Sequence, residues 1–506
     1  MDFFIENENK IPRGDVRTRF APSPTGFMHV GGIRTALYTY LTAKSLGGKF
    51  ILRIEDTDQA RFVEGATEVI FKTLRGAGLQ HDEGPDVGGP VGPYTQSERK
   101  LLYRPYAEKL CETGHAYYCF CGHVEHDERD HSGLGEVSLV ADPCRALTLQ
   151  EALTRVDAGE THVIRMKTPR EGTTTFSDVI YGDITVENKT LDDMVLIKGD
   201  NLPTYNFANV IDDHLMGITH VIRGAEYLAS APKYNLLYSA FGWEIPTYIT
   251  VSLIMRDAQH KLSKRKGDPT YEDLLESGYV TDAIINYVAL LGWSPGGERE
   301  LFTLPELCEN FDFMRISKSP AIFDIAKLRY FNAEYIRAMS PEAFATAAEP
   351  FIRHAANGDN NLADNNNVIC NDAKIASIAE LIHARCELLS EIPDMIDFIT
   401  ALQEYDTELF VHKKSKTDEK ISLDVLKTLI PAFAALEEWT RDSLYDCMVS
   451  LAEKQEVKNA LIMWPARIAV SGKTVTPGGA AEICAVLGRD ESLRRMEIAV
   501  NKLKAK

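Results

Sequence analysis

The sequence predicts an α/β N-terminal half that is split by an insertion, followed by an all-α C-terminal half. Two stretches, residues 16–54 and 220–251, combine strand-like and helix-like apolar patterns. Beyond about residue 340, helix-forming Ala, Leu, Glu and Lys are common and strand-like runs are few. Because 506 residues exceed what one hydrophobic core supports, we expect roughly two to four domains.

Residues 16–54 show the strand, turn, helix, strand order with which nucleotide-binding α/β domains begin. Apolar and basic residues alternate over 16–20, which is the period of a strand, and the prolines that follow end it. Apolar residues recur at helical spacing over 33–41, and 50–54 is a second strand-like run. The turn opens onto a helix N-terminus, which favours anions, and His29 stands at that point.

The α/β pattern returns in the later stretch. Residues 220–223 are typical of a buried strand, and residues 248–251 of another. Between them, residues 227–241 have near-helical apolar spacing, with Pro232 expected to kink or restart the helix. The two stretches are therefore expected to form one domain that an insertion interrupts.

Two motifs resemble those of a known family. Residues 29–32 (HVGG) resemble the HIGH motif of class I aminoacyl-tRNA synthetases, and residues 19–26 (RFAPSPTG) resemble the version in glutamyl-tRNA synthetases. About 230 residues further on, residues 261–268 (KLSKRKGD) resemble the second class I motif, with leucine where methionine is commoner. Four cations within six residues suit a loop that grips phosphate. The chain is therefore identified as a member of this class, of the glutamyl type.

The resemblance implies a domain order. It predicts a Rossmann-like catalytic domain in two halves, a connective insertion for the tRNA acceptor end, a stem-contact linking domain and a helical anticodon-binding region. Their expected boundaries are residues 1–94 and 204–256, 95–203, 257–340, and 341–506.

The resemblance also implies a two-step reaction. The α-carboxylate of L-glutamate attacks the α-phosphorus of ATP, giving glutamyl-adenylate and pyrophosphate. The tRNA then takes the glutamyl group and AMP leaves. Because the attacking carboxylate is ionised at neutral pH, catalysis depends on positioning and on stabilising phosphate charge, with Mg²⁺ accompanying ATP. The expected partner is tRNA-Glu, and the open alternative is an enzyme that also charges tRNA-Gln with glutamate.

The site residues follow by resemblance. The catalytic residues are His29, Lys261 and Lys264. The glutamate-binding residues are Arg19, Ala21, Ser23, Glu55, Tyr205, Asn209 and Arg223. The ATP-binding residues are His29, Gly31, Gly32, Glu226, Lys261, Ser263, Lys264 and Arg265.

Substrate chemistry refines two of these roles. The side chain of glutamate is an anion, and arginine suits it better than lysine because it pairs with a carboxylate through two parallel hydrogen bonds. Arg19 and Arg223 are both assigned to the amino-acid pocket, with Arg223 favoured for the side chain. Glu55 follows a predicted strand and is expected to hold the substrate ammonium group. The alternative for Glu55 is a solvated acidic turn.

Three cysteines resemble the zinc site of some bacterial glutamyl-tRNA synthetases: Cys119, Cys121 and Cys144. A structural zinc needs four ligands, and the family's fourth position is Ala146 here. Three histidines close in sequence could replace it: His123, His126 and His131. The alternative is three ordinary reduced cysteines.

In the C-terminal half, Arg385 lies near where glutamyl enzymes carry a residue that reads the anticodon. The local match is short, so the alternative of a surface arginine stays open. Residues 357–367 are expected to form a polar loop.

Composition limits the setting of the protein. Nine cysteines at irregular spacings do not form a disulfide framework, no apolar run is long enough to span a membrane, and the N-terminus is not a secretory signal. We therefore expect a cytoplasmic monomer, with residues 1–15 as a short polar extension. The net charge of −19 requires RNA binding to use a local cluster of basic residues.

Three rival interpretations remain. A glutaminyl-tRNA synthetase usually has Pro-Glu-Pro-Asn where residues 22–25 here are PSPT. A tRNA-modifying enzyme that attaches glutamate to a base is shorter and lacks the anticodon-binding half. A small-molecule nucleotidyltransferase does not need the long helical C-terminal half.

Overall fold

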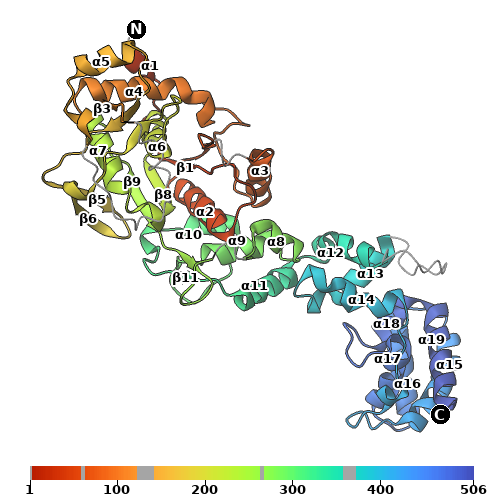
Figure 1. Ribbon diagram of the computed structural model, residues 1–506. Helices are drawn as coiled ribbons and strands as arrows, with labels where there is room; N and C mark the ends of the chain where they lie inside the picture. Colours follow the sequence, from red (N-terminus) through yellow and green to blue (C-terminus); the bar gives the residue numbers. More distant parts are fainter. Residues whose placement is uncertain (1–2, 59–62, 122–141, 263–266, 357–371, 506) are drawn as a thin grey trace. The chain divides into compact units, whose positions relative to one another are not determined.

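The computed structural model describes residues 3–58, 63–121, 142–262, 267–356 and 372–505 (Figure 1). The chain divides into two compact units. The first contains Met1–Leu274 and Ile284–Ile325, and the second contains Leu275–Ala283 and Ala326–Lys506. The predicted linking domain at 257–340 is thus shared between the two units.

The first unit contains the strands β1 (Arg17–Phe20), β2 (Lys49–Leu52), β3 (Ala116–Cys119), β4 (Val163–Met166), β5 (Thr173–Asp178), β6 (Gly182–Glu187), β7 (Val195–Ile197), β8 (His220–Gly224), β9 (Thr247–Val251), β10 (Ile254–Met255) and β11 (Ala321–Ile322). Its helices are α1 (Phe3–Glu8), α2 (Val30–Ser45), α3 (Ala66–Gly76), α4 (Lys100–Glu112), α5 (Leu149–Asp157), α6 (Tyr205–Leu215), α7 (Ala231–Phe241) and α10 (Leu304–Asn310).

Three helices cross the boundary between the units: α8 (Tyr271–Glu276), α9 (Thr281–Ala289) and α11 (Ile325–Ala338). The remaining helices belong to the second unit. They are α12 (Pro341–Ala356), α13 (Asp372–Ile382), α14 (Ile392–Thr400), α15 (Glu419–Ala434), α16 (Arg441–Lys454), α17 (Asn459–Ser471), α18 (Ala480–Leu487) and α19 (Arg489–Lys504).

A six-stranded sheet in the order β2-β1-β8-β9-β5-β6 forms the centre of the first unit (Figure 1). Its neighbouring strands are parallel except β6, which is antiparallel to β5. Side chains alternate along β1, so Thr18 Oγ1 donates to Thr39 O of α2 at 3.0 Å, while Arg19 points to α6 on the other face. The chain leaves β1 toward β2, and β8 lies on the other side of β1. This strand order makes a switch point at which α/β sheets bind ligands.

The predicted strands and helices of both α/β stretches are confirmed. They are β1, α2, β2, β8, α7 and β9. Pro232 lies in the first turn of α7, where its missing N–H costs nothing, and so it restarts the helix.

The β5–β6 hairpin differs from the expectation of a wholly separate insertion. It lies within residues 95–203 but extends the central sheet, whereas β3, β4 and β7 form a three-stranded sheet of their own. In β5, Thr174, Phe176 and Asp178 are buried while the residues between them are exposed. This alternation is the pattern of a strand with one covered face.

The N-terminal segment also differs from the expected polar extension. Residues Phe3–Glu8 form α1, and the rings of Phe3 and Phe4 lie 5.9 and 5.1 Å from the ring of Tyr106 on α4. Glu8 Oε1 lies 2.7 Å from His214 Nε2 at the end of α6. The mainly polar composition of residues 1–15 concealed these aromatic contacts.

Helices α12–α19 of the second unit share one hydrophobic core, which includes Ile378, Leu429 and Ile468. The all-α prediction for this half is confirmed. The predicted polar loop at 357–367 lies outside the described residues. None of the described helices combines the length and the apolar character that crossing a bilayer requires.

Candidate active site

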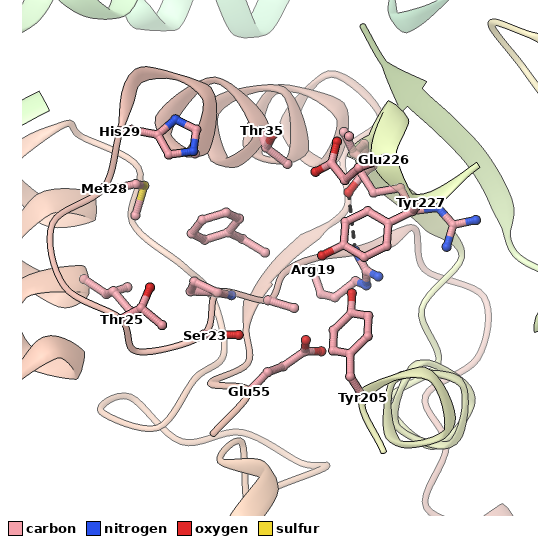
Figure 2. A pocket seen from close by; sticks show the side chains of 18 of the residues that line it. Arg19, Ser23, Thr25, Met28, His29, Thr35, Glu55, Tyr205, Glu226 and Tyr227 are labelled. Carbon is pink, nitrogen blue, oxygen red and sulfur yellow. Dashed lines mark hydrogen bonds between the residues drawn. The ribbon is translucent and has the colours of Figure 1, made fainter. Parts of the chain in front are cut away.

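A pocket of about 300 Å³ opens at the carboxyl ends of β1 and β8 (Figure 2). It is enclosed by the turn between β1 and α2, by the residues after β2 and β8, and by the start of α6. Its lining residues are Arg19, Phe20, Ala21, Pro22, Ser23, Thr25, Gly26, Phe27, Met28, His29, Gly32, Thr35, Glu55, Ile70, Tyr205, Ile222, Arg223, Gly224, Glu226 and Tyr227.

Most of the sequence-predicted site residues meet in this pocket. They are Arg19, Ala21, Ser23, His29, Gly32, Glu55, Tyr205, Arg223 and Glu226. Sequence reasoning did not select Thr25, Thr35 or Tyr227, although Figure 2 shows all three side chains in the pocket. Thr25 lies inside the quoted motif and Tyr227 directly follows Glu226, so both could have been found by extending those matches.

Three predicted residues lie elsewhere, and three lie outside the described part of the chain. Gly31 and Lys261 do not line the pocket. Asn209 is buried, and its Nδ2 donates to Tyr205 O at 3.2 Å, so it is placed behind Tyr205. Ser263, Lys264 and Arg265 fall within the undescribed residues 263–266.

His29 is the N-cap of α2. Its Nδ1 accepts a hydrogen bond from Gly31 N at 2.8 Å, so the neutral ring carries its proton on Nε2. A Cβ at Gly31 would lie 2.5 Å from His29 Cε1, closer than any real contact. Gly31 therefore leaves room for the imidazole at the mouth of the pocket.

The segment that follows the second motif (residues 261–268) lies beside the start of the first motif (residues 29–32). Thr270 forms an antiparallel bridge with His29, and Tyr271 N donates to Met28 O at 3.1 Å. On the other flank, Lys261 is exposed and forms a bridge with Met255 of β10. The chain segment after the second motif is thus fixed beside the imidazole.

A buried charge network lies beneath the pocket. Arg19 Nε donates to Asp213 Oδ1 at 3.0 Å, and Arg53 Nη1 donates to the same oxygen at 2.7 Å. Burial alone raises the pKa of Asp213, but the two guanidinium groups hold it below its usual value. Asp212, the neighbouring residue, accepts a 2.7 Å hydrogen bond from Arg99 Nε.

Sequence reasoning missed both aspartates. The sequence signal that could have revealed them is the number of arginines in and next to the predicted strands. Arg17, Arg19 and Arg53 are almost wholly buried, and such cations need buried carboxylates nearby.

Glu55 is only partly satisfied. Its Oε1 accepts a hydrogen bond from Arg53 Nη2 at 2.9 Å, while its Oε2 is buried and has no hydrogen-bond partner within the described part of the chain. Burial raises its pKa to about 7, even though Arg53 and Arg19 act in the opposite direction. A buried, unpartnered acceptor at a pocket wall is a binding point for a cationic group.

Arg223 is the least satisfied cation at the site. It is 6% exposed, and no described residue offers a hydrogen-bond partner to its Nε or Nη2. In contrast to Arg19, it forms no ion pair with any residue that the structure describes. A ligand carboxylate would give this guanidinium an anionic partner and hydrogen-bond acceptors.

The three predicted cysteines lie together in the insertion. The Sγ atoms of Cys119, Cys121 and Cys144 and a carboxylate oxygen of Asp142 all lie within 4.8 Å of one another. Cys121 Sγ and Cys144 Sγ are 3.4 Å apart. Sequence reasoning did not include Asp142. The three candidate histidines lie outside the described residues.

Arg385 lies in the short turn that follows α13 in the second unit. Its side chain is exposed, and its Nη1 donates to Thr476 O at 2.5 Å. Arg467 is close enough to Arg385 that their charges repel, which together with burial lowers the pKa of Arg467. Two cations therefore lie beside the loop between α17 and α18.

Comparison with known proteins agrees with this geometry. Residues 15–330 match the family model for the catalytic domain of class I tRNA synthetases (E and Q), and residues 343–500 match that of an anticodon binding domain. A glutamate–tRNA ligase of Clostridium botulinum (strain Loch Maree / Type A3) is 53% identical over 492 residues, covering 97% of this chain and 99% of the relative. One of Clostridium tetani is 52% identical over 500 residues, covering 98% and 99%.

Among solved structures, a glutamate tRNA ligase from Elizabethkingia meningosepticum in complex with its amino acid is similar. The two are 33% identical, with a TM-score of 0.84 over 97% of this chain and 100% of that chain. The chain therefore belongs to the class I tRNA synthetases of the glutamate and glutamine group. Its relatives described above are glutamate–tRNA ligases, so the sequence-based assignment to a glutamyl-type class I enzyme is confirmed. Enzymes of this class use ATP with Mg²⁺.

Proposed function

We propose that this enzyme ligates L-glutamate to tRNA-Glu through glutamyl-adenylate, with release of pyrophosphate and AMP. The observation that carries the proposal is that one pocket contains a buried cation and a buried carboxylate oxygen, each of which needs a partner of opposite charge. Among the residues that the structure describes, Arg223 finds no anionic partner and Glu55 Oε2 finds no donor. L-glutamate offers a carboxylate to the first and an ammonium group to the second.

The other residues proposed for glutamate binding lie around these two groups. Arg19 and Tyr205 line the pocket next to Glu55, and Ser23 offers a hydroxyl on the opposite side (Figure 2). Ala21 leaves room for the substrate. Asn209 would act through Tyr205, whose backbone oxygen accepts a hydrogen bond from its Nδ2.

The ATP side lies toward the start of α2. His29 and Gly32 would contact phosphate at the helix N-terminus, and Glu226 lies near the nucleoside. Lys261 and the undescribed Ser263, Lys264 and Arg265 would grip the pyrophosphate. Magnesium supplies charge stabilisation on the phosphates. The chain's own residues supply position and counter-charge, which is all the first step needs because its nucleophile is already ionised.

The insertion is proposed to hold a structural zinc ion. Three thiolates and one carboxylate are a donor set for tetrahedral zinc, and Asp142 would be the fourth ligand. The 3.4 Å between Cys121 Sγ and Cys144 Sγ is near the edge of about 3.8 Å expected for such a site. Asp142 also accepts hydrogen bonds from Cys144 N and Tyr117 Oη, both at 2.9 Å, as metal-bound carboxylates do.

The tRNA would contact two regions. The insertion at 95–203 would bind the acceptor end, and the helical region at 341–506 would bind the anticodon, with Arg385 as a base-reading residue. The enzyme would act as a cytoplasmic monomer.

Aminoacylation tests the proposal. Purified enzyme is given tRNA-Glu or tRNA-Gln with labelled glutamate or glutamine. Glutamate on tRNA-Glu is expected. Glutamate on both tRNAs would identify a non-discriminating enzyme, and glutamine on tRNA-Gln would contradict the proposal.

A further inference from the structure

Three aromatic rings surround the guanidinium of Arg223. Its Cζ lies 4.4 Å from the ring centroid of Tyr248, 5.0 Å from that of Tyr234 and 5.6 Å from that of Phe176. All three aromatic side chains are buried, with at most 3% exposure. We call Phe176, Tyr234 and Tyr248 the aromatic cage.

The sheet and one helix build this cage. Arg223 on β8 is in register with Thr250 on β9, so Tyr248, two residues earlier, projects from the same face of β9. Asp178 on β5 is in register with Tyr248, which puts Phe176 on that face as well. The rings of Phe176 and Tyr248 are 4.8 Å apart.

The remaining wall comes from α7. Tyr234 lies on this helix, and its hydroxyl donates to Asn206 Oδ1 at 2.6 Å, which fixes the ring over the guanidinium. Asn235 Nδ2 donates to Thr175 O at 3.2 Å, which holds α7 against β5. The cage is therefore a packed structure and not a chance approach of mobile side chains.

An aromatic cage can hold a buried cation without cancelling its charge, whereas a carboxylate would cancel it. The π faces attract a cation, and this attraction is strongest where water is excluded. Because ring faces do not accept in-plane hydrogen bonds as a carboxylate does, Nε and Nη2 of Arg223 stay without a partner among residues 3–58, 63–121, 142–262, 267–356 and 372–505. Arg19 shows the opposite arrangement, since Asp213 already neutralises it.

We propose that Phe176, Tyr234 and Tyr248 are positioning residues that set selectivity for an anionic amino-acid side chain, because they hold Arg223 buried without neutralising it. This inference rests on the proposed role of Arg223 in binding the side-chain carboxylate of glutamate. A ligand that brings a negative charge completes the ion pair. A glutamine amide leaves the buried cation unpaired and is rejected.

One ring of the aromatic cage comes from outside the two α/β stretches, residues 16–54 and 220–251. Phe176 lies on β5, within the region that the sequence predicts as the insertion. The β5–β6 hairpin therefore supplies one ring of the aromatic cage around Arg223 as well as two strands of the sheet. No motif in the sequence pointed to this contribution.

A matched pair of variants at one position tests the proposal. Tyr248→Phe keeps the ring, and Tyr248→Leu removes it while keeping an apolar side chain. In pyrophosphate exchange with tRNA present, Tyr248→Leu is expected to raise KM for glutamate roughly tenfold with little change in kcat or in KM for ATP. Inhibition by glutamine should stay as weak as in the parent enzyme, so the ratio of the two affinities falls. Tyr248→Phe should resemble the parent.

Phe176→Leu is the second test, in case Tyr248→Leu does not fold. A purely structural role would lower kcat, raise both KM values and leave the ratio of glutamate to glutamine affinity unchanged, and this result would overturn the proposal. Arg223→Ala distinguishes a failure of the cage proposal from a failure of the role proposed for Arg223. If Arg223→Ala abolishes glutamate selectivity and both cage variants keep it, only the cage is wrong. If Arg223→Ala itself keeps selectivity, the proposed function of Arg223 is wrong.

Discussion

Arg53 Nη2 donates a hydrogen bond of 2.9 Å to Glu55 Oε1, yet the other carboxylate oxygen of Glu55 is buried and no residue that the structure describes donates to it. Burial raises the pKa of Glu55 to about 7, so its charge changes near neutral pH. An ionised Glu55 attracts the substrate ammonium group, and a protonated one does not. We predict that the dissociation constant for glutamate rises as pH falls from 8 to 6, measured by calorimetric titration.

The control for this prediction is Glu55→Gln. This variant should bind glutamate weakly and without the pH step, because its side chain does not titrate. The same shift affects stability with the opposite sign. A pKa above the unfolded value means that the folded protein holds the proton more tightly, so this contribution is complete below about pH 4.5 and is lost as pH rises through 7. A parent enzyme with flat glutamate affinity from pH 6 to 8 contradicts the proposed role.

Asp213 pairs with two buried arginines, Arg19 and Arg53, and Arg53 also pairs with Glu55. Asp213→Asn should therefore destabilise the first unit by about 3 kcal/mol, because it removes the carboxylate that pairs with Arg19 and leaves the two buried cations with one counter-charge fewer. Denaturant unfolding followed by a probe in this unit measures the effect. Glu112→Gln is the matched control, since it breaks an exposed 3.0 Å ion pair with Lys109 and should cost less than about 1 kcal/mol. Equal stability of the two variants would refute this account.

The sequence predicted those parts of the fold and site that local pattern determines. Alternation over residues 16–20 placed β1, and the turn residues after it placed His29 at the start of α2. Partners that are distant in the sequence left no local sign. Asp213 meets Arg19 across 194 residues, and Phe176 reaches Arg223 through strand order in the sheet. The choice of Asp142 as a candidate ligand likewise needed the geometry of the cysteines.

Gly31 gives a test of the phosphate side of the pocket. A methyl group at this position would meet the His29 ring at 2.5 Å and push it from its place. We predict that Gly31→Ala lowers the rate of pyrophosphate exchange at least tenfold and leaves glutamate binding by calorimetry unchanged. Gly76→Ala is the control, because its Cβ would meet nothing within 4 Å at the end of α3, and it should be fully active. Normal exchange by Gly31→Ala would show that the ring position does not matter.

Lys264 is assigned from the second motif alone, so kinetics must test it. We predict that Lys264→Ala lowers the adenylation rate at least tenfold, because a cation that grips the pyrophosphate acts mainly in the transition state. KM for glutamate should hardly change, since the amino-acid contacts lie elsewhere. Single-turnover formation of adenylate measures both quantities. A variant as fast as the parent would rule out the assigned role.

Asp142 decides between two descriptions of the cysteine cluster. If it is the fourth ligand of zinc, chelator-washed protein that is then reloaded should retain about one equivalent of zinc, and Asp142→Asn should lose most of it. Combined replacement of His123, His126 and His131 by alanine should then leave the zinc content unchanged. If instead a histidine supplies the fourth ligand, the triple histidine variant should lose most of its zinc and Asp142→Asn should keep it. Metal analysis separates these outcomes, and less than half an equivalent in the parent protein would mean that the three sulfurs are ordinary reduced thiols packed in a turn.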